Sequence, residues 1–480
     1  MPQIGFLGPT YTSRSLNFDA QRTVNLYPEV NETRQGKSVA AFFGTPGLLL
    51  WQTLPGVDAV RALHTTGSNR VFAVRGAGVY EVFANATNQY RGSLMTTSGP
   101  VGIADNGIQL VFVDGSTSGF FLTLDSNIYG PIADPDFVGA DRAAFLDQYL
   151  LFNKPGTQQF YWSDLSSVNF NALDFASAEG ASDALLALTV HMRELWLFGQ
   201  HSTEVWFDVG PPSVFTRIQG AYFEQGIVAP QSLASDGVSL YWAGQDKRGQ
   251  GIIFRARSYQ AERISTHAVE CALQSYTTLA DGLGWCQQQE GHIFYWLTFP
   301  AGNATWCFDS TTGLWHERAY RDPLTGLLGR HRANCYTYGF GKHLVGDYAN
   351  GNLYSLDMST FTDNGAPLLS LRRFPYLADS ADLHWIRIDR LQLDIESGVG
   401  LDGSPAVGVD PQMMLRWSDD GAHTWSNEHW ASAGKIGERK RRAIWRRLGR
   451  TRGRVGEISC SDPVKRVWLT AHMDMGEVGR

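Results

Sequence analysis

The sequence predicts an all-β fold, in which a β-propeller is followed by a C-terminal β-sandwich-like domain. The composition is the first reason, because 51 glycines together with 15 Trp, 18 Tyr and 26 Phe are typical of tight turns and strands. The second is a hairpin pattern that recurs along most of the 480 residues, and the third is that this pattern stops near residue 376. Hydrophobic residues make up 43% and charged residues 18%, so the chain can bury a core.

The first element, residues 1–50, shows neither the hairpin pattern nor low complexity. We expect an arm that lies across another element, either closing a ring or pairing with the C-terminal domain. Its first residues contain no basic region followed by an apolar stretch, so no signal peptide is expected.

The second element, residues 51–376, is expected to be the propeller. Each repeated unit consists of an alternating aromatic and aliphatic strand, a turn rich in Gly, Asn or Asp, and a second such strand. A four-stranded blade takes roughly 40 to 50 residues, which matches a spacing of 39 to 53 residues between successive first strands. Seven hairpins favour seven blades, six blades stay possible, and a pair of sandwiches is the alternative. The first strands begin near residues 70, 109, 148, 194, 239, 292 and 342.

The first unit has the pattern of a complete blade, with strands over residues 59–65, 70–75, 79–83 and 89–95. Because both faces of a blade pack on neighbouring blades, its strands should be apolar on both sides. Eight aromatic side chains are therefore expected to be buried between blades: Phe72, Phe112, Trp162, Trp196, Trp206, Trp242, Trp296 and Trp306.

The third element, residues 377–480, is expected to be the sandwich-like domain. A turn in it, residues 418–425, resembles the Asp-box of sialidases and related propellers, in which Asp and Gly shape a hairpin turn and Trp packs beneath it. That box is structural in those enzymes, so it supports a hairpin and no activity. The pattern predicts six strands, over residues 387–396, 412–418, 424–430, 441–448, 455–461 and 467–473.

The cysteines are expected to be free thiols, because they are odd in number, spread over 190 residues and without a Cys-x-x-Cys pair. Two of them, Cys286 and Cys307, are expected on neighbouring strands of one blade. The longest apolar runs are far shorter than the roughly 20 residues of a membrane helix, so no membrane insertion is expected. The five cysteines are Cys271, Cys286, Cys307, Cys335 and Cys460.

Motifs for catalysis and for cofactors are not recognised. His316-Glu317 begins like a zincin helix but lacks the second histidine, and the glycine-rich residues 244–251 lack a Gly-Lys-Ser/Thr sequence. A glycosidase would need two carboxylates about a sugar, or a Tyr nucleophile with an arginine cluster, and spacing selects none of the 47 acidic residues. We therefore expect no catalytic residues, no metal and no cofactor.

Charge is distributed unevenly along the chain. The net charge is −7, which excludes a globally basic nucleic-acid coat, yet residues 435–454 carry +9 and the remainder −16. These basic residues could contact DNA phosphate or the acidic surface of a neighbouring subunit. We favour the subunit interface, because the remainder is acidic and because the interleaved Ile444, Trp445 and Leu448 need burial. The ten candidate contacts are Lys435, Arg439, Lys440, Arg441, Arg442, Arg446, Arg447, Arg450, Arg452 and Arg454.

Several segments resemble one family of bacteriophage proteins. They are residues 17–29 (Asn-Phe-Asp-Ala-Gln-Arg-Thr-Val-Asn-Leu-Tyr-Pro-Glu), residues 44–48 (Gly-Thr-Pro-Gly-Leu), and the ending from residues 445–450 to residues 461–464. Residues 162–164 (Trp-Ser-Asp) and 199–206 (Gly-Gln-His-Ser-Thr-Glu-Val-Trp) fit the same family. Together they are similar to the packaged-DNA stabilisation proteins, also called tail hub or nozzle, of short-tailed bacteriophages.

The resemblance implies a virion structural protein that is not an enzyme. Six copies would form a homo-hexamer beneath the portal-adaptor ring and extend the DNA channel, with a tail needle or plug at the distal end and tailspikes or fibres around the sides. Genomic DNA would be retained and then pass through without sequence-specific contacts. We expect assembly in the host cytoplasm, a place in the virion tail, and a monomer in dilute solution.

Two other functions stay open at this point. A sialidase-like or other carbohydrate-active propeller would have a central pocket lined by carboxylates and arginines. A cellular propeller scaffold would be a monomer with one exposed binding patch.

Overall fold

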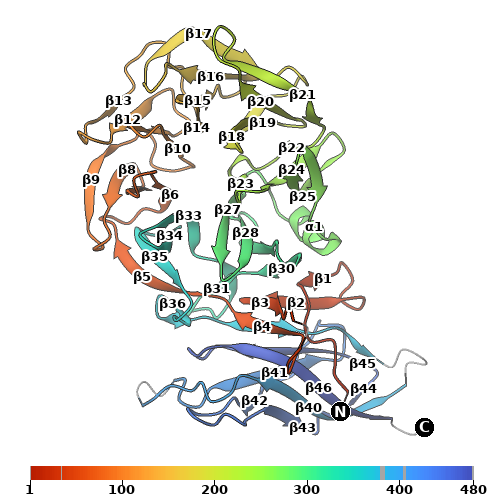
Figure 1. The fold of residues 1–480 in the computed structure, drawn as a ribbon. Coiled ribbons are helices and arrows are strands. Elements are labelled where there is room, and N and C mark those ends of the chain that lie inside the picture. The colour runs from red at the N-terminus through yellow and green to blue at the C-terminus, as the bar shows by residue number, and fades with distance from the viewer. Residues whose placement is uncertain (1, 34, 379–383, 404–406, 478–480) are drawn as a thin grey trace.

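Seven sheets, each built on four antiparallel strands, surround a common centre in the computed structural model, which describes residues 2–33, 35–378, 384–403 and 407–477 (Figure 1). The predicted β-propeller is confirmed, and the described residues form seven blades. Blade 1 contains β6 (Val60–Thr65), β7 (Val71–Arg75), β8 (Gly78–Val82) and β9 (Asn88–Ser93), and blade 2 contains β10 (Gly102–Asp105), β11 (Gln109–Val113), β12 (Gly119–Thr123) and β13 (Tyr129–Pro131). Blade 3 contains β14 (Ala143–Leu146), β15 (Tyr149–Asn153), β16 (Gln159–Ser163) and β17 (Phe170–Ser177). Blade 4 contains β18 (Leu185–His191), β19 (Glu194–Gly199), β20 (Thr203–Asp208) and β21 (Phe215–Phe223).

The last three blades are less regular. The inner strand of blade 5 is split by a 3-10 turn, and α1 (His267–Gln274) follows that blade. A small hairpin, β31 (Ala319–Arg321) and β32 (Leu328–Arg330), separates blades 6 and 7. Blade 5 contains β22 (Gly226–Ile227), β23 (Ala234–Ser235), β24 (Leu240–Asp246), β25 (Gly249–Arg257) and β26 (Gln260–Arg263). Blade 6 contains β27 (Leu283–Gln289), β28 (His292–Phe299), β29 (Ala304–Asp309) and β30 (Leu314–Glu317). Blade 7 contains β33 (Ala333–Gly339), β34 (Lys342–Asp347) and β35 (Asn352–Asp357).

A strand from the N-terminal region closes the ring. β5 (Gly47–Thr53) pairs antiparallel with β35, with Leu48 opposite Leu356, and so provides the fourth strand of blade 7. The short strands β36 (Thr362–Asp363) and β37 (Ala366–Pro367) extend the same sheet. The proposed boundary at residue 50 therefore falls within a strand of the propeller.

The packing between blades explains the apolar faces of the strands. One cluster of buried hydrophobic side chains lies between each pair of neighbouring blades, including blades 7 and 1. Seven of the eight aromatic residues expected in these layers are buried. Trp206 is only half-buried, because the pairing of β20 with β21 shifts beside it and its indole N–H bonds Glu204 Oε2 at 3.1 Å.

The C-terminal β-sandwich is also confirmed, and strands of the N-terminal arm take part in both of its sheets. Across one sheet the order of neighbouring strands is β3, β4, β46, β40 and β43. Across the other sheet it is β2, β38, β45, β41 and β42. The strands are β1 (Tyr11–Thr12), β2 (Ala20–Val24), β3 (Leu26–Val30), β4 (Ala40–Gly44), β38 (Ser370–Arg373), β39 (Leu377–Ala378), β40 (Ile386–Ile395), β41 (Gln412–Ser418), β42 (His429–Ser432), β43 (Ala443–Arg446), β44 (Arg450–Thr451), β45 (Gly453–Cys460) and β46 (Val467–Glu477).

One sheet runs from the propeller into the sandwich without a break. β2 lies between β30 of blade 6, with Val24 opposite Glu317, and β38, which pairs in turn with β45. The arm thus pairs with both domains, whereas the sequence offered ring closure and C-terminal pairing as alternatives.

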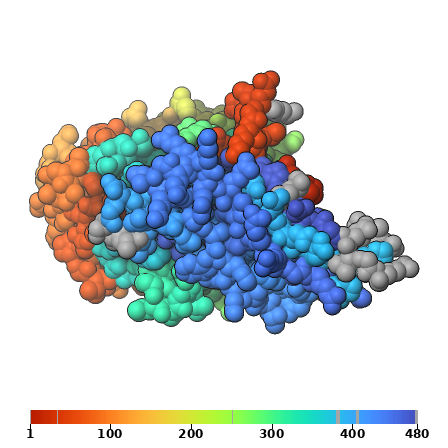
Figure 2. All heavy atoms as spheres, turned by 90° about the horizontal axis from the view of Figure 1, so that it is seen from below, coloured from red at the N-terminus to blue at the C-terminus, as the bar shows by residue number. Residues whose placement is uncertain are grey.

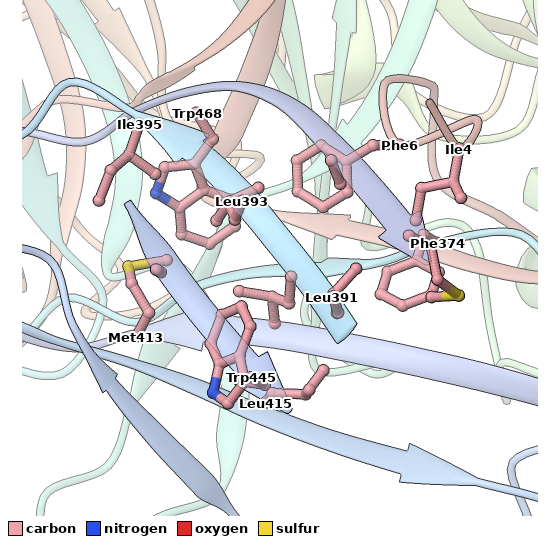
Figure 3. Packing of buried hydrophobic residues seen from close by; sticks show 14 of the residues in the cluster. Ile4, Phe6, Phe374, Leu391, Leu393, Ile395, Met413, Leu415, Trp445 and Trp468 are labelled. Atoms are coloured by element: carbon pink, nitrogen blue, oxygen red, sulfur yellow. The ribbon is translucent and has the colours of Figure 1, made fainter. Parts of the chain in front are cut away.

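The sandwich core is built from large side chains of both sheets and of the N-terminal segment (Figure 3). Phe6 and Trp468 meet there with ring centroids 6.3 Å apart, and Leu391, Leu415 and Trp445 are almost fully buried. Full burial of such a side chain contributes about 2–3 kcal/mol to folding.

Two details differ from the sequence-based expectations. The strand expected over residues 424–430 begins only at His429, because the preceding turn is held by Asp420, whose carboxylate accepts hydrogen bonds from Thr424 N and His423 N. Cys286 and Cys307 are not on neighbouring strands, since β28 lies between them and they face different packing layers. All five cysteines are free.

Candidate functional site: an arginine-rich face of the sandwich

The arginine-rich segment lies on the sandwich at the end remote from the propeller. Figure 1 places β40, β42 and β43 at that end, and Figure 2 looks onto it. Nine of the ten basic residues singled out in the sequence are exposed, and we call their surface the arginine face: Lys435, Arg439, Lys440, Arg441, Arg442, Arg446, Arg447, Arg450 and Arg452.

The tenth residue, Arg454, has a structural role. It is 4% exposed, and its Nε and Nη2 bond the two carboxylate oxygens of Asp419 at 2.6 and 2.8 Å. Its guanidinium also lies 4.8 Å from the ring centre of Trp417. A buried guanidinium that is paired in this way is not available to a partner, so Arg454 is excluded from the arginine face.

The charges of the arginine face are largely uncompensated. Arg442 is 3.2 Å from Asp394, and this is the one ion pair that the described residues offer to any member of the face. Glu438, the single acid of the segment, bonds the backbone N of Lys435. The other eight cations face water and form no ion pair with the described part of the chain.

Strand pairing brings further arginines to the same place. Arg446 lies opposite Arg390, and Arg450 lies opposite Arg387. Arg387 pairs with Asp389 and Arg390 with Asp474. Like charges directly opposite on neighbouring strands cost stability, so a concentration of this kind is expected where it serves binding.

An exposed tryptophan lies among these cations. Trp385 is 40% exposed, and the guanidinium carbons of Arg450 and Arg452 lie 5.1 and 5.2 Å from its ring centre. Sequence reasoning missed Trp385, Arg387 and Arg390. Their signal was weak, because they precede the basic segment by 45 to 50 residues and the pairing of β40 with β43 and β44 brings the two segments together.

The apolar residues between the arginines do not need a neighbouring subunit. Trp445 is 4% and Leu448 5% exposed, both within the core shown in Figure 3, and the indole N–H of Trp445 bonds His429 O at 2.7 Å. Ile444 is half-buried. This part of the argument for a subunit interface was therefore wrong, because the chain itself buries two of these side chains.

The Asp-box-like turn supports the sandwich rather than a reaction. Hydrogen bonds from Ser418 and Thr424 hold the pKa of Asp420 well below its usual range. Trp425 lies between the guanidinium groups of Arg373 and Arg416, 4.7 and 4.8 Å from its ring centre, and both arginines pair with a carboxylate of β45.

Residues 2–33, 35–378, 384–403 and 407–477 hold no cluster of three His, Cys, Asp or Glu side chains arranged as metal ligands. In the same ranges no helix is long and apolar enough to span a membrane.

Three chains of solved structures share part of the fold. A chain of the mitotic checkpoint complex is 13% identical, with a TM-score of 0.43, and the match covers 65% of this chain and 94% of that chain. Two structures of the extracellular domain of a B. thetaiotaomicron protein, described in one as a one component system and in the other as a hybrid two component system, are 8% identical with a TM-score of 0.44. Each match covers 64% of this chain and 39% of that chain. These scores are too low to carry an argument.

Two family models match almost the whole chain. The model described as "Bacteriophage P22 Gp10, beta-propeller" matches residues 3–361, and the one described as "Bacteriophage P22 Gp10, beta-sandwich" matches residues 377–476. No curated protein sequence matches the chain. The two models match in the order in which the structure places the propeller and the sandwich, and the chain belongs to the Bacteriophage P22 Gp10 family of phage DNA stabilisation proteins.

Proposed function

We propose that this virion protein is the tail hub, or nozzle, of a short-tailed phage. Six copies form a ring beneath the portal-adaptor ring, prolong the DNA channel, and release the DNA when a needle or plug leaves. Tailspikes or fibres attach around the sides. The family match over both domains carries this proposal.

The structure offers two features that suit the role. The sheet that joins blade 6 to the sandwich through β2 and β38 makes one continuous body, which suits a wall that holds pressurised DNA. The arginine face offers uncompensated cations at one end of that body. We propose that these cations contact DNA phosphate, because guanidinium groups that face water can bind phosphate without any further burial of apolar surface.

A carbohydrate-active enzyme finds less support. A cavity of about 620 Å³ lies at the propeller centre and is lined by Asp58, Arg61, Asp281 and Arg330 among others. Three of these side chains are already engaged: Asp58 with Arg75, Arg61 with four backbone carbonyls, and Asp281 with the backbone N of Ala301. We therefore propose a structural role without catalysis. We also propose residue 377 as the boundary between the propeller and the sandwich.

The proposal is tested by assembly. The purified chain is measured by native mass spectrometry alone and with the adaptor ring, and tails are imaged by electron microscopy. We expect a monomer alone and six copies on the adaptor, with loss of packaged DNA from particles that lack the chain. Particles that retain DNA without it, or a hub without sixfold order, would contradict the proposal.

A further inference from the structure

A pocket on the propeller has no role in the proposed function. It has a volume of about 530 Å³ and lies where blades 5, 6 and 7 meet. The wall from blade 7 consists of Tyr336 and Tyr338 on β33 and of His343 on β34, whereas Gln288 on β27 and Asp236 after β23 line it from blades 6 and 5.

The wall from blade 7 is the end of a column of stacked rings. Trp285 stacks on Trp296 with centroids 5.6 Å apart, Tyr336 lies parallel to Trp285 at 6.4 Å, and His343 continues the row at the hydroxyl end of Tyr336, with centroids 6.0 Å apart. Tyr338 leans against His343 at 5.1 Å, with 54° between the rings, and is 56% exposed. The column fixes the position of His343, so the pocket has a rigid apolar wall that a ligand does not have to order.

The polar groups at this wall are only partly used. The Tyr336 hydroxyl bonds Nδ1 of His343 at 2.9 Å, which leaves Nε2 for another partner. Gln288 is exposed, and its side-chain amide bonds none of the described residues. Asp236, by contrast, is occupied by the Tyr241 hydroxyl at 2.8 Å and by Ser239 N at 2.6 Å. The free groups are therefore uncharged donors and acceptors.

The lining of the pocket holds one carboxylate, Asp236, and neither lysine nor arginine. Burial lowers the pKa of His343 and raises the pKa of Cys286, so both are uncharged at neutral pH. Lys342 precedes His343 on β34 and points to the opposite side of the strand. A neutral ligand with several hydroxyl groups therefore fits this environment better than an anion, and its hydroxyl groups match the uncharged donors and acceptors of the wall.

We propose that the pocket binds one ring of a neutral sugar. The apolar C–H face of a pyranose packs on Tyr338 and His343, and its hydroxyl groups bond the Gln288 amide and Nε2 of His343. This inference does not depend on the tail-hub role, because it concerns a surface of the propeller that the arginine face does not share.

A nucleobase is the competing flat ligand, and the geometry disfavours it. A base gains most from a slot between two parallel rings. Here the two outer rings of the wall, Tyr338 and His343, stand at 54° to each other, and Tyr336 is packed against Trp285 with 14° between the rings. An angled wall of this kind suits a puckered ring.

The test uses the full chain and a panel of neutral monosaccharides: glucose, galactose, mannose and N-acetylglucosamine. Binding is followed by saturation-transfer NMR and by the fluorescence of Trp285, which lies one ring away from the pocket wall. The variants are Tyr338→Ala and Gln288→Ala. The matched control is Tyr90→Ala, since Tyr90 is 53% exposed on blade 1 and does not line the pocket.

We expect at least one sugar to saturate the protein at millimolar concentration, and Tyr338→Ala and Gln288→Ala each to weaken it about tenfold or more. Tyr90→Ala should bind like the parent. Thermal unfolding should be unchanged in all three variants, because all three side chains are exposed. The inference is overturned if no sugar of the panel saturates, if Tyr338→Ala binds as well as the parent, or if adenosine or uridine saturates the site and the sugars do not.

Discussion

Arg22 and Glu317 join the N-terminal arm to blade 6 through a forked ion pair, with Nη2 2.6 Å from Oε2 and Nε 2.9 Å from Oε1. The two side chains come from strands that are 295 positions apart in sequence, and they are 30% and 17% exposed. Glu317 raises the pKa of Arg22 further above its usual range, so the guanidinium stays charged at physiological pH. The ion pair adds a side-chain contact between β2 and β30, whose backbone pairing has a single pair of residues in register, Val24 and Glu317.

Removing one charge of this pair should destabilise the fold. Glu317→Gln leaves Arg22 half-enclosed without its counter-charge, and we expect a loss of about 1–3 kcal/mol in the free energy of unfolding, measured by urea denaturation. Asp147→Asn is the control, because the Arg193–Asp147 pair is 81% and 32% exposed and should be worth less than about 0.5 kcal/mol. If the two variants lost equal free energies of unfolding, the Arg22–Glu317 pair would contribute no more to stability than an exposed surface pair.

The inter-blade layers should be sensitive to truncation. Trp242 is fully buried between blades 4 and 5, and its indole N–H bonds Gly226 O at 3.1 Å. Trp242→Ala should cost about 3–5 kcal/mol, from lost burial and from the cavity left behind. Trp430→Ala, at a side chain that is 61% exposed, should change the midpoint of thermal unfolding little. A mild effect at Trp242 would show that the blades pack loosely.

Stability should depend on pH through Asp363. This residue is 1% exposed, neither carboxyl oxygen has a hydrogen-bond partner among the residues that the structure describes, and burial raises its pKa from 3.8 to about 7. The folded state therefore keeps a proton that the unfolded state releases between pH 4 and 7, roughly, so stability falls as pH rises through that interval. Asp363→Asn removes this dependence.

We accordingly expect Asp363→Asn to be more stable than the parent at pH 8, with a smaller difference at pH 5, by chemical denaturation at both values. The exposed Asp402→Asn is the control. A difference that is the same at both pH values would show that the carboxyl group does not titrate in this range.

The arginine face should bind DNA without sequence preference. Replacement of Arg446, Arg447 and Arg450 by Ser should weaken binding to any duplex, and the slope of log affinity against log salt should fall by roughly one unit per lost contact. The control is Arg193→Ser, an exposed arginine on the propeller. If the face is a subunit interface instead, the parent will show negligible DNA binding and the triple variant will fail to assemble on the adaptor.

The parts of the fold that sequence predicted are those encoded locally. The strands of blade 1 begin and end within two residues of their expected limits, because a hairpin and its turn lie within one short segment. Ring closure by the N-terminal arm was one of two expected alternatives, but the strand β5 and its partner β35 were not predicted, since the two lie about 300 residues apart and no local pattern marks the pairing.

The candidate site shows the same limit. The concentration of arginines was visible in the sequence, and their exposure follows from their charge. The burial of Trp445 by the chain's own core depended on Leu391 and Leu415, which lie on other strands, and so could not be read from the segment itself. The pairing of Arg454 with Asp419 was hidden for the same reason.

The seam at β2 has a mechanical consequence. When the sandwich is pulled away from the propeller, part of the load passes through the strip between β30 and β2, where Asn25 N donates to Glu317 O at 2.9 Å and Thr10 N donates to Trp315 O at 2.8 Å. Asn25 adds side-chain bonds to Ala319 O and Leu369 O, each 2.8 Å long, and Ala319 N donates to its Oδ1 at 3.0 Å. Under tension the molecule should yield first at this strip, with each domain still folded, so Asn25 and the Arg22–Glu317 pair set the force at which the two halves part.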